Sequence, residues 1–172
     1  MKDLQRIIRD VPDFPKQGIL FKDITPLLTD PEAFRETIDR MADQWADKQV
    51  DVIVGIEARG FIFAAALAYK MGAGLVIVRK PGKLPYTTNS VTYDLEYGTD
   101  SLEVHTDAIT PGQNVLIVDD VLATGGTVKA VSELLRQFEA NLLGVTFLAE
   151  LRFLNGREKL IHCGEITTLM TF

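Results

Sequence analysis

The sequence predicts an α/β fold with an open, mainly parallel sheet and helices on both of its faces. Short runs of β-favouring apolar residues alternate four times with segments of helical periodicity, the pattern of parallel strands joined by crossover helices. The run from Val115 to Val118 has no period-two alternation, so we expect a strand buried on both faces. With 172 residues, 47% of them hydrophobic, the chain is long enough for a single domain, residues 1–172, with a buried core.

Composition and charge exclude several classes of protein. The formal net charge of −6 argues against nucleic acid or an anionic membrane surface as the main partner. The single cysteine, Cys163, excludes an intramolecular disulfide and a cysteine-based metal site, so we expect a small buried or idle thiol. No apolar run could span a membrane, and residues 1–10 are charged and amphipathic, unlike a signal peptide. We therefore expect a soluble cytoplasmic protein.

The N-terminal part, about residues 1–28, is predicted to form a hood over the domain. Residues 2–9 have helical spacing, and Val11-Pro12 ends that pattern. The following run, residues 13–26, is rich in proline and has neither helical nor strand periodicity, so we expect an ordered loop. It could pack under the sheet, or Leu20, Phe21 and Lys22 could form one wall of a pocket for a flat aromatic ligand.

The next elements are two strands, each followed by a polar turn. Asp30-Pro31 predicts a helix start, and residues 50–56 predict a strand that turns at residues 57–61 into a helix ending at Met71. Arg59 would supply charge to an anion site at that helix start. A strand at residues 74–78 leads into a Pro/Gly loop that carries three cations, Arg79, Lys80 and Lys83. This loop indicates a second anion site rather than a solvated turn.

Residues 86–105 have the pattern of a two-stranded flap. Polar and aromatic residues alternate, and we expect the return strand at residues 101–105. The basic loop and flexible flap together span about residues 80–105, and a long excursion between central strands is often a lid. Further along the chain, residues 142–149 predict another strand, whereas residues 160–163 and 167–172 are short and poorly determined.

Chemistry concentrates directly after the strand at Val115 to Val118. Asp119 and Asp120 end this strand, and the small-residue turn Ala123 to Thr127 leads into a helical pattern over residues 128–138. The unpaired N–H groups of a helix start can hold a phosphate, with hydroxyls of the turn as further donors. Carboxylates do not bind phosphate, so the acidic pair should face sugar hydroxyls or a hard divalent cation. A pentose 5-phosphate fits both halves.

The run Val115 to Thr127 resembles the phosphoribosyl-diphosphate signature of the type I phosphoribosyltransferases. The chain is also similar to the adenine-specific branch of that family from Val11 almost to its end, at residues 12–15, 18–26, 58–61, 79–85, 93–98 and 156–159. The resemblance implies the type I phosphoribosyltransferase fold. It also implies transfer of ribose 5-phosphate from 5-phosphoribosyl 1-diphosphate to N9 of adenine, which gives AMP and diphosphate.

The resemblance assigns roles to residues of this sequence. Glu96 would manage the proton at the imidazole edge of adenine, Tyr97 would help to close the flap, and Arg59 would act at the reacting centre. The other implied contacts are with ribose (Asp119, Asp120), the 5-phosphate (Ala123, Thr124, Gly125, Gly126, Thr127), diphosphate (Arg59, Arg79, Lys80, Lys83) and adenine (Leu20, Phe21, Lys22, Leu151).

The resemblance further implies magnesium, a homodimer and a cis peptide bond at Glu57-Ala58. The metal would be held mainly by substrate and water, with Asp119 or Asp120 as an optional protein ligand.

Three other interpretations stay open: a sister transferase for hypoxanthine, guanine or orotate, a regulator that senses phosphoribosyl compounds without turnover, and a nucleotide-binding fold with other chemistry. The hood and flap separate the first from an adenine enzyme, and the basic loop with Glu96 argues against the second.

Overall fold

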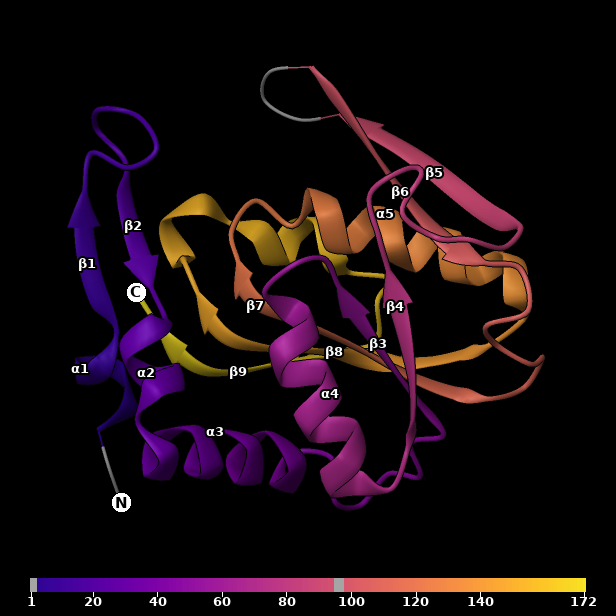
Figure 1. Cartoon of the computed structure of the whole chain (residues 1–172), viewed down its shortest axis with the longest axis horizontal. Coiled ribbons are helices and arrows are strands. Elements are labelled where there is room, and N and C mark those ends of the chain that lie inside the picture. The colour runs from indigo at the N-terminus through magenta and orange to yellow at the C-terminus, as the bar shows by residue number, and fades with distance from the viewer. Residues whose placement is uncertain (1–2, 95–97) are drawn as a thin grey trace.

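A computed structural model describes residues 3–94 and 98–172, and its centre is a five-stranded parallel sheet in the order β4-β3-β7-β8-β9 (Figure 1). All neighbouring strands in this sheet run parallel, which confirms the predicted fold class. The carboxyl ends of these strands therefore lie at one edge. The strand bounds are β3 Val52–Ile56, β4 Gly74–Val78, β7 Asn114–Leu122, β8 Asn141–Glu150 and β9 Glu165–Thr171.

Different elements cover the two faces of the sheet. One face packs against α1 to α4, and the other packs against α5 and the antiparallel hairpin β5-β6 (Figure 1). Three 3₁₀ helices, at Arg136–Phe138, Arg152–Leu154 and Gly156–Leu160, complete the connections after α5. The bounds are α1 Leu4–Ile7, α2 Thr25–Thr29, α3 Pro31–Asp43, α4 Gly60–Met71, β5 Thr88–Asp94, β6 Thr99–His105 and α5 Gly126–Leu135.

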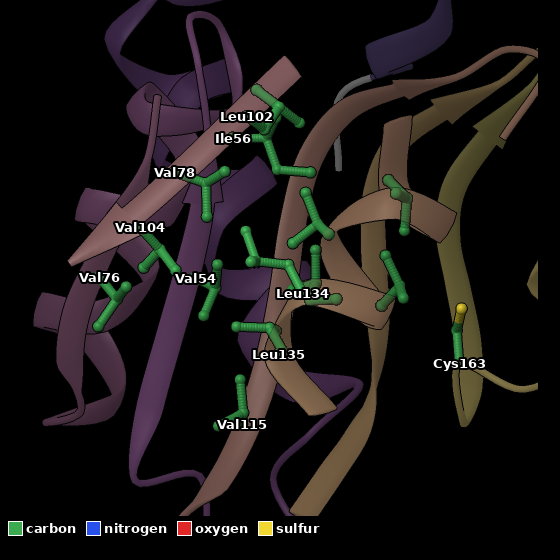
Figure 2. Close-up of a cluster of buried hydrophobic side chains, with 14 of the residues drawn as sticks. Val54, Ile56, Val76, Val78, Leu102, Val104, Val115, Leu134, Leu135 and Cys163 are labelled. Atoms are coloured by element: carbon green, nitrogen blue, oxygen red, sulfur yellow. The ribbon is translucent and has the colours of Figure 1, made fainter. Parts of the chain in front are cut away.

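Alternate residues of the central strands supply both cores. Val115 and Ile117 pack toward α5 and the hairpin, whereas Leu116 and Val118 pack toward α3 and α4. Figure 2 shows the first of these cores, in which β3, β4, β6, β7 and α5 all contribute side chains. Cys163 lies in the same core with 1% of its surface exposed, so the expectation of a buried thiol is confirmed.

Helix α3 begins where the sequence indicates. Asp30 is its N-cap, and the carboxylate oxygen Oδ1 accepts hydrogen bonds of 3.0 Å from the backbone N–H groups of Glu32 and Ala33. These bonds satisfy two of the N–H groups that have no partner within the helix. Pro31 fits the first helical position because its missing N–H is not needed there.

The predictions were wrong at the two ends of the chain. The first helix ends at Ile7 rather than continuing to residue 9. The hood contains an antiparallel pair: β1 (Arg9–Pro12) precedes the predicted loop, and β2 (Leu20–Asp23) lies within it. Most of residues 167–172, which looked poorly determined, belong to the edge strand β9, Glu165–Thr171. Both errors have one cause: the hydrogen bonds of these strands come from partners that no local periodicity reveals.

No helix among the described residues is long and apolar enough to cross a membrane.

Candidate functional site

The carboxyl ends of the parallel strands surround one cavity. Its volume is about 380 Å³, and it is lined by the carboxyl end of β7, by the segments that follow β3 and β4, by Thr127 of α5 and by the flap. This is the position at which open α/β sheets bind ligands. The lining residues are Glu57, Ala58, Arg59, Lys80, Tyr93, Asp100, Leu102, Asp119, Asp120, Val121 and Thr127.

The acidic pair lies inside a strand rather than after one. Strand β7 continues to Leu122 because its last residues pair with Ala149 and Glu150 of β8, so the predicted strand end was too early. The pair is closely tied to its surroundings. The Asp119 carboxylate accepts a 2.9 Å hydrogen bond from the backbone N–H of Asp120, and the buried Asp120 carboxylate forms a 2.8 Å ion pair with Arg59 Nε.

Burial makes both carboxylates costly to ionise. It raises the pKa of Asp119 well above its usual range, and the adjacent charge of Asp120 raises it further. Burial also raises the pKa of Asp120, although the Arg59 guanidinium offsets part of that effect. The pair therefore favours a ligand that brings hydrogen-bond donors or positive charge to these oxygens.

The turn Ala123–Thr127 forms a second, smaller pocket of about 70 Å³ beside the first. Asp119, Thr124, Gly125 and Thr127 line this pocket, and Gly125 adopts a positive φ of 77° directly before α5 begins. A Cβ on Gly125 would overlap the carbonyl oxygen of Gly156, and a Cβ on Gly156 would overlap that of Ala123. The first turn of the 3₁₀ helix Gly156–Leu160 therefore sets the backbone path of this phosphate-type turn.

Arg59 joins the acidic pair to the hood. It precedes α4, and its guanidinium carbon lies 4.9 Å from the centroid of the Phe21 ring. Close packing also fixes the start of α4, since a Cβ on Gly60 would lie 2.8 Å from Asp119 Oδ1. The peptide bond between Glu57 and Ala58 is cis, as the resemblance implied.

The three cations of the basic loop all have carboxylate partners. Arg79 Nε lies 3.3 Å from Glu57 Oε2, Lys83 Nζ pairs with Glu57 Oε1, and Lys80 Nζ pairs with Asp100. Burial alone would raise the pKa of Glu57, but its hydrogen bonds from the loop lower the pKa overall. Of these cations, Lys80 lines the larger cavity.

The predicted base-contacting residues belong to two places. Leu20, Phe21 and Lys22 lie on β2, where Lys22 Nζ is 2.6 Å from Asp10 Oδ1 and 4.0 Å from the centroid of the Phe172 ring. Leu151 follows β8, and its backbone N–H donates a 2.9 Å hydrogen bond to the Leu122 carbonyl. The structure thus ties the C-terminal end of the chain to the hood, a contact that the sequence did not suggest.

The sequence analysis missed some site residues, and others that it named lie outside the described part of the chain. Glu57, Asp100 and Gly156 were not singled out, although each belongs to or borders a segment that carried the resemblance. The two flap residues Glu96 and Tyr97 lie outside the described residues.

Comparison with known proteins places the whole chain in one group. Residues 27–158 match the model of the phosphoribosyl transferase domain. A protein of Geobacter metallireducens called adenine phosphoribosyltransferase is 59% identical over 172 residues, which is 100% of both chains. The crystal structure of adenine phosphoribosyltransferase from Thermoanaerobacter pseudethanolicus is 51% identical with a TM-score of 0.96, over 99% of this chain and 98% of that one.

A solved relative contains ligands. The enzyme of this name from Saccharomyces cerevisiae, crystallised with an imino-altritol bisphosphate and adenine, is 44% identical with a TM-score of 0.91. The match covers 97% of this chain and 96% of the yeast one.

Proposed function

The chain belongs to the adenine phosphoribosyltransferase family, and we propose that it transfers ribose 5-phosphate from 5-phosphoribosyl 1-diphosphate to N9 of adenine. The products are AMP and diphosphate, so the enzyme is a pentosyltransferase of purine salvage. The observation that carries this function is a single cavity in which the acidic pair, Arg59 and Thr127 meet, in a chain 59% identical to a named relative.

The geometry supports a separate role for each wall of the cavity. The bond from ribose C1 to the diphosphate oxygen breaks, the leaving diphosphate takes the electron pair, and N9 of adenine forms the new bond to C1. While the C1–O bond breaks, positive charge grows on the ribose and negative charge on the diphosphate, so catalysis is mainly electrostatic and positional. Asp119 and Asp120 accept hydrogen bonds from the ribose hydroxyls, and the 5-phosphate is held by N–H groups and hydroxyls of Ala123 to Thr127, at the start of α5.

Diphosphate would bind on the opposite side of the cavity. We assign it to Arg59 and Lys80, with Arg79 and Lys83 close behind in the basic loop.

Magnesium fits the site, because the carboxylates of the acidic pair line the cavity. Among residues 3–94 and 98–172, no three acidic, His or Cys side chains group into a closed metal cage. When bound, mainly to substrate oxygens and water, the ion would neutralise charge on the diphosphate.

The adenine contacts are proposed from the hood and from the end of β8. Phe21, with Leu20 and Lys22, would read the base, and Leu151 would cover its other face. When N9 bonds to C1, adenine loses the proton of its imidazole ring, and Glu96 would receive this proton at the imidazole edge. Tyr97 would help to close the flap over the diphosphate. Both assignments rest on the sequence resemblance alone.

We also propose that residues 1–172 act as one cytoplasmic domain that assembles as a homodimer. Support for assembly comes from apolar side chains that stay exposed on β4 and α4, among them Leu75 and Ile77. Adenine and 5-phosphoribosyl 1-diphosphate would be its small-molecule partners, without nucleic acid or membrane.

The direct test measures AMP formation from adenine, 5-phosphoribosyl 1-diphosphate and magnesium. Wild type should be active, Asp119→Asn/Asp120→Asn should lose at least about 100-fold in kcat/KM, and Glu96→Ala should be strongly impaired. Parallel assays with hypoxanthine, guanine and orotate test the sister activities. Turnover with one of these bases instead of adenine would contradict the assignment of the hood, and no turnover with any base would favour a sensor.

A further inference from the structure

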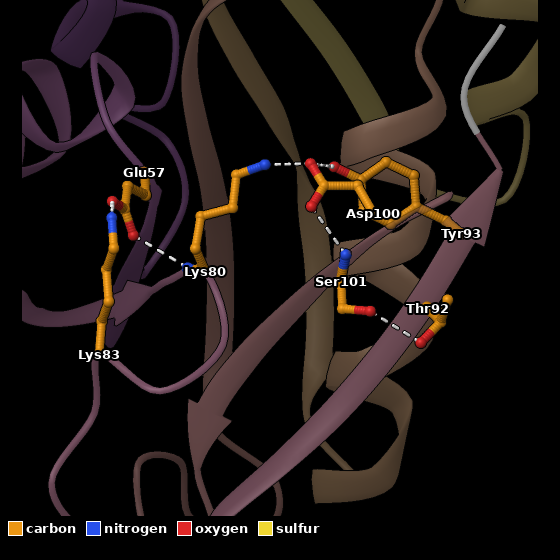
Figure 3. Close-up of polar contacts among 7 residues, drawn as sticks. All are labelled: Glu57, Lys80, Lys83, Thr92, Tyr93, Asp100 and Ser101. Carbon is orange, nitrogen blue, oxygen red and sulfur yellow. Dashed lines mark hydrogen bonds and ion pairs between the residues drawn. The ribbon is translucent and has the colours of Figure 1, made fainter. Parts of the chain in front are cut away.

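Lys80 meets a flap carboxylate inside the cavity. Its ammonium pairs with Asp100 Oδ2, and the same oxygen accepts a 3.4 Å hydrogen bond from the Tyr93 hydroxyl (Figure 3). The other oxygen, Oδ1, accepts a 2.9 Å hydrogen bond from the backbone N–H of Ser101. Both carboxylate oxygens of Asp100 are therefore engaged, and Lys80 approaches an acceptor that is already held in place.

The backbone fixes this pair from both sides. Asp100 lies on β6, and this strand is joined to the start of the basic loop by two hydrogen bonds between the backbones of Arg79 and Glu103, of 2.9 and 2.8 Å. The Glu103 side chain also accepts a 3.1 Å hydrogen bond from the backbone N–H of Gly82. Asp100 and Lys80 thus face each other across a junction that β6 and the loop build together.

The electrostatics show a formed ion pair. The hydrogen bond from Lys80 lowers the pKa of Asp100 and outweighs the effect of its burial, while the same bond raises the pKa of Lys80. Both groups are charged at neutral pH. Arg79 and Lys83 have Glu57 as their partner. Lys80 is the loop cation that lines the cavity, and its ammonium group is paired with Asp100.

We propose that Asp100 is a positioning residue that holds the Lys80 ammonium group and thereby competes with the diphosphate for it. The inference rests on the proposed function, in which Lys80 binds diphosphate. The lysine ammonium is a compact charge that can donate its hydrogen bonds either to a carboxylate oxygen or to a phosphate oxygen. The free energy of the Lys80–Asp100 pair is therefore subtracted from the affinity for diphosphate, which limits how tightly the product is retained.

The test measures binding of inorganic diphosphate with magnesium by isothermal titration calorimetry. Asp100→Asn keeps the size of the side chain and its acceptor oxygen but removes the charge. It should bind diphosphate about threefold to fivefold more tightly, the gain expected from releasing a partly exposed ion pair. The KM for 5-phosphoribosyl 1-diphosphate should fall while the KM for adenine stays unchanged. Asp100→Ala should shift the affinity in the same direction.

A double-mutant cycle separates this pair from a general change in charge. In a Lys80→Gln background, Asp100→Asn should give no gain in affinity, because the competition needs both partners. Asp107→Asn is the matched control, since Asp107 is exposed, lies outside the cavity lining and changes the net charge equally. It should leave diphosphate binding as in the wild type.

Each outcome decides between the two proposals. Unchanged or weaker diphosphate binding in Asp100→Asn would overturn the role of Asp100, and so would an equal gain in the Lys80→Gln background. If the wild type forms AMP in that case, the proposed function still holds. Coupled tightening in a protein that forms no AMP would reject the proposed function and support the role of Asp100. A wild type that binds no diphosphate would overturn both.

Discussion

Two adjacent aspartates, the buried Asp120 and the partly buried Asp119, lie where the chemistry is proposed, and their placement opposes stability. Asp119 and Asp120 line the cavity, and burial raises the pKa of each. A carboxylate whose pKa is higher in the folded than in the unfolded protein is ionised more readily after unfolding, so its ionisation weakens the fold. Substrate hydroxyls or a cation would relieve this cost, which is typical of sites arranged for a ligand.

Replacing Asp119 by Asn should therefore stabilise the ligand-free protein while it impairs activity. Between the ordinary Asp pKa of 3.8 and the raised folded value, the native state binds more protons than the unfolded state, so wild-type stability falls as pH rises through this window. Above that window the Asn variant should melt a few degrees higher than wild type, and below 3.8 the difference should vanish. Thermal unfolding from about pH 3 to 8 measures both limits. A variant less stable than wild type at pH 8 would refute this explanation.

At the scale of elements, two segments far apart in sequence build the phosphate-type turn together. The turn Ala123–Thr127 packs on Gly156, whose helix is anchored by Arg157: its Nε donates to both oxygens of Glu150, at 2.8 and 2.9 Å. The positive φ of Gly125 and the missing side chain of Gly156 let the two backbones approach closely. The 3₁₀ helix Gly156–Leu160 therefore acts as the support of the 5-phosphate site.

Gly156→Ala should displace the turn, because the added methyl group overlaps the Ala123 carbonyl oxygen. We expect a loss of stability of about 1–3 kcal/mol, as for other overpacked sites, and a rise of about tenfold in the KM for 5-phosphoribosyl 1-diphosphate. Steady-state kinetics and urea unfolding measure these effects. Gly74→Ala is the matched control, since its Cβ would find ordinary contacts at 3.5 and 3.7 Å. Equal KM values in the two variants would show that Gly156 does not support the turn.

At the scale of the whole molecule, the β4 edge of the sheet exposes apolar side chains. Leu75 and Ile77 are 45% and 37% exposed, and they alternate with the buried Val76 and Val78. The exposed pair lies on the sheet face that α4 covers, because Leu75 is in register with Ile53, which packs toward that helix. The basic loop follows the same strand, so a partner here would lie close to the proposed diphosphate site.

The double substitution Leu75→Lys/Ile77→Lys should convert the proposed homodimer into monomers. Charged side chains on the apolar strip would be costly to bury between two subunits, whereas they are solvated in a monomer. Light scattering after size-exclusion chromatography should give twice the 19.1 kDa chain mass for wild type and the single mass for the variant. Ile161→Lys changes an exposed residue outside β4 and α4 and should stay dimeric. A monomeric wild type would reject the proposed assembly.

The sequence by itself determined the features that depend on neighbouring residues. The buried strand around Val115 to Val118, the helix start at Asp30-Pro31 and the order of acidic pair, turn and helix were all readable, because each depends on local periodicity or on a motif of adjacent residues. The alternation of strand and helix patterns also indicated the α/β class, and the resemblance extended to the cis peptide bond at Glu57-Ala58.

Only the tertiary structure decided which groups face one another. The partners of the basic loop, Glu57 and Asp100, lie 20 or more residues from the lysines that they hold, and the contact between Gly125 and Gly156 joins residues that are farther apart still. The edge strand β9 likewise takes its hydrogen bonds from β8, a partner that its own pattern does not indicate. Such contacts depend on strand order and on the meeting of loops at one edge of the sheet, and these are properties of the folded chain as a whole.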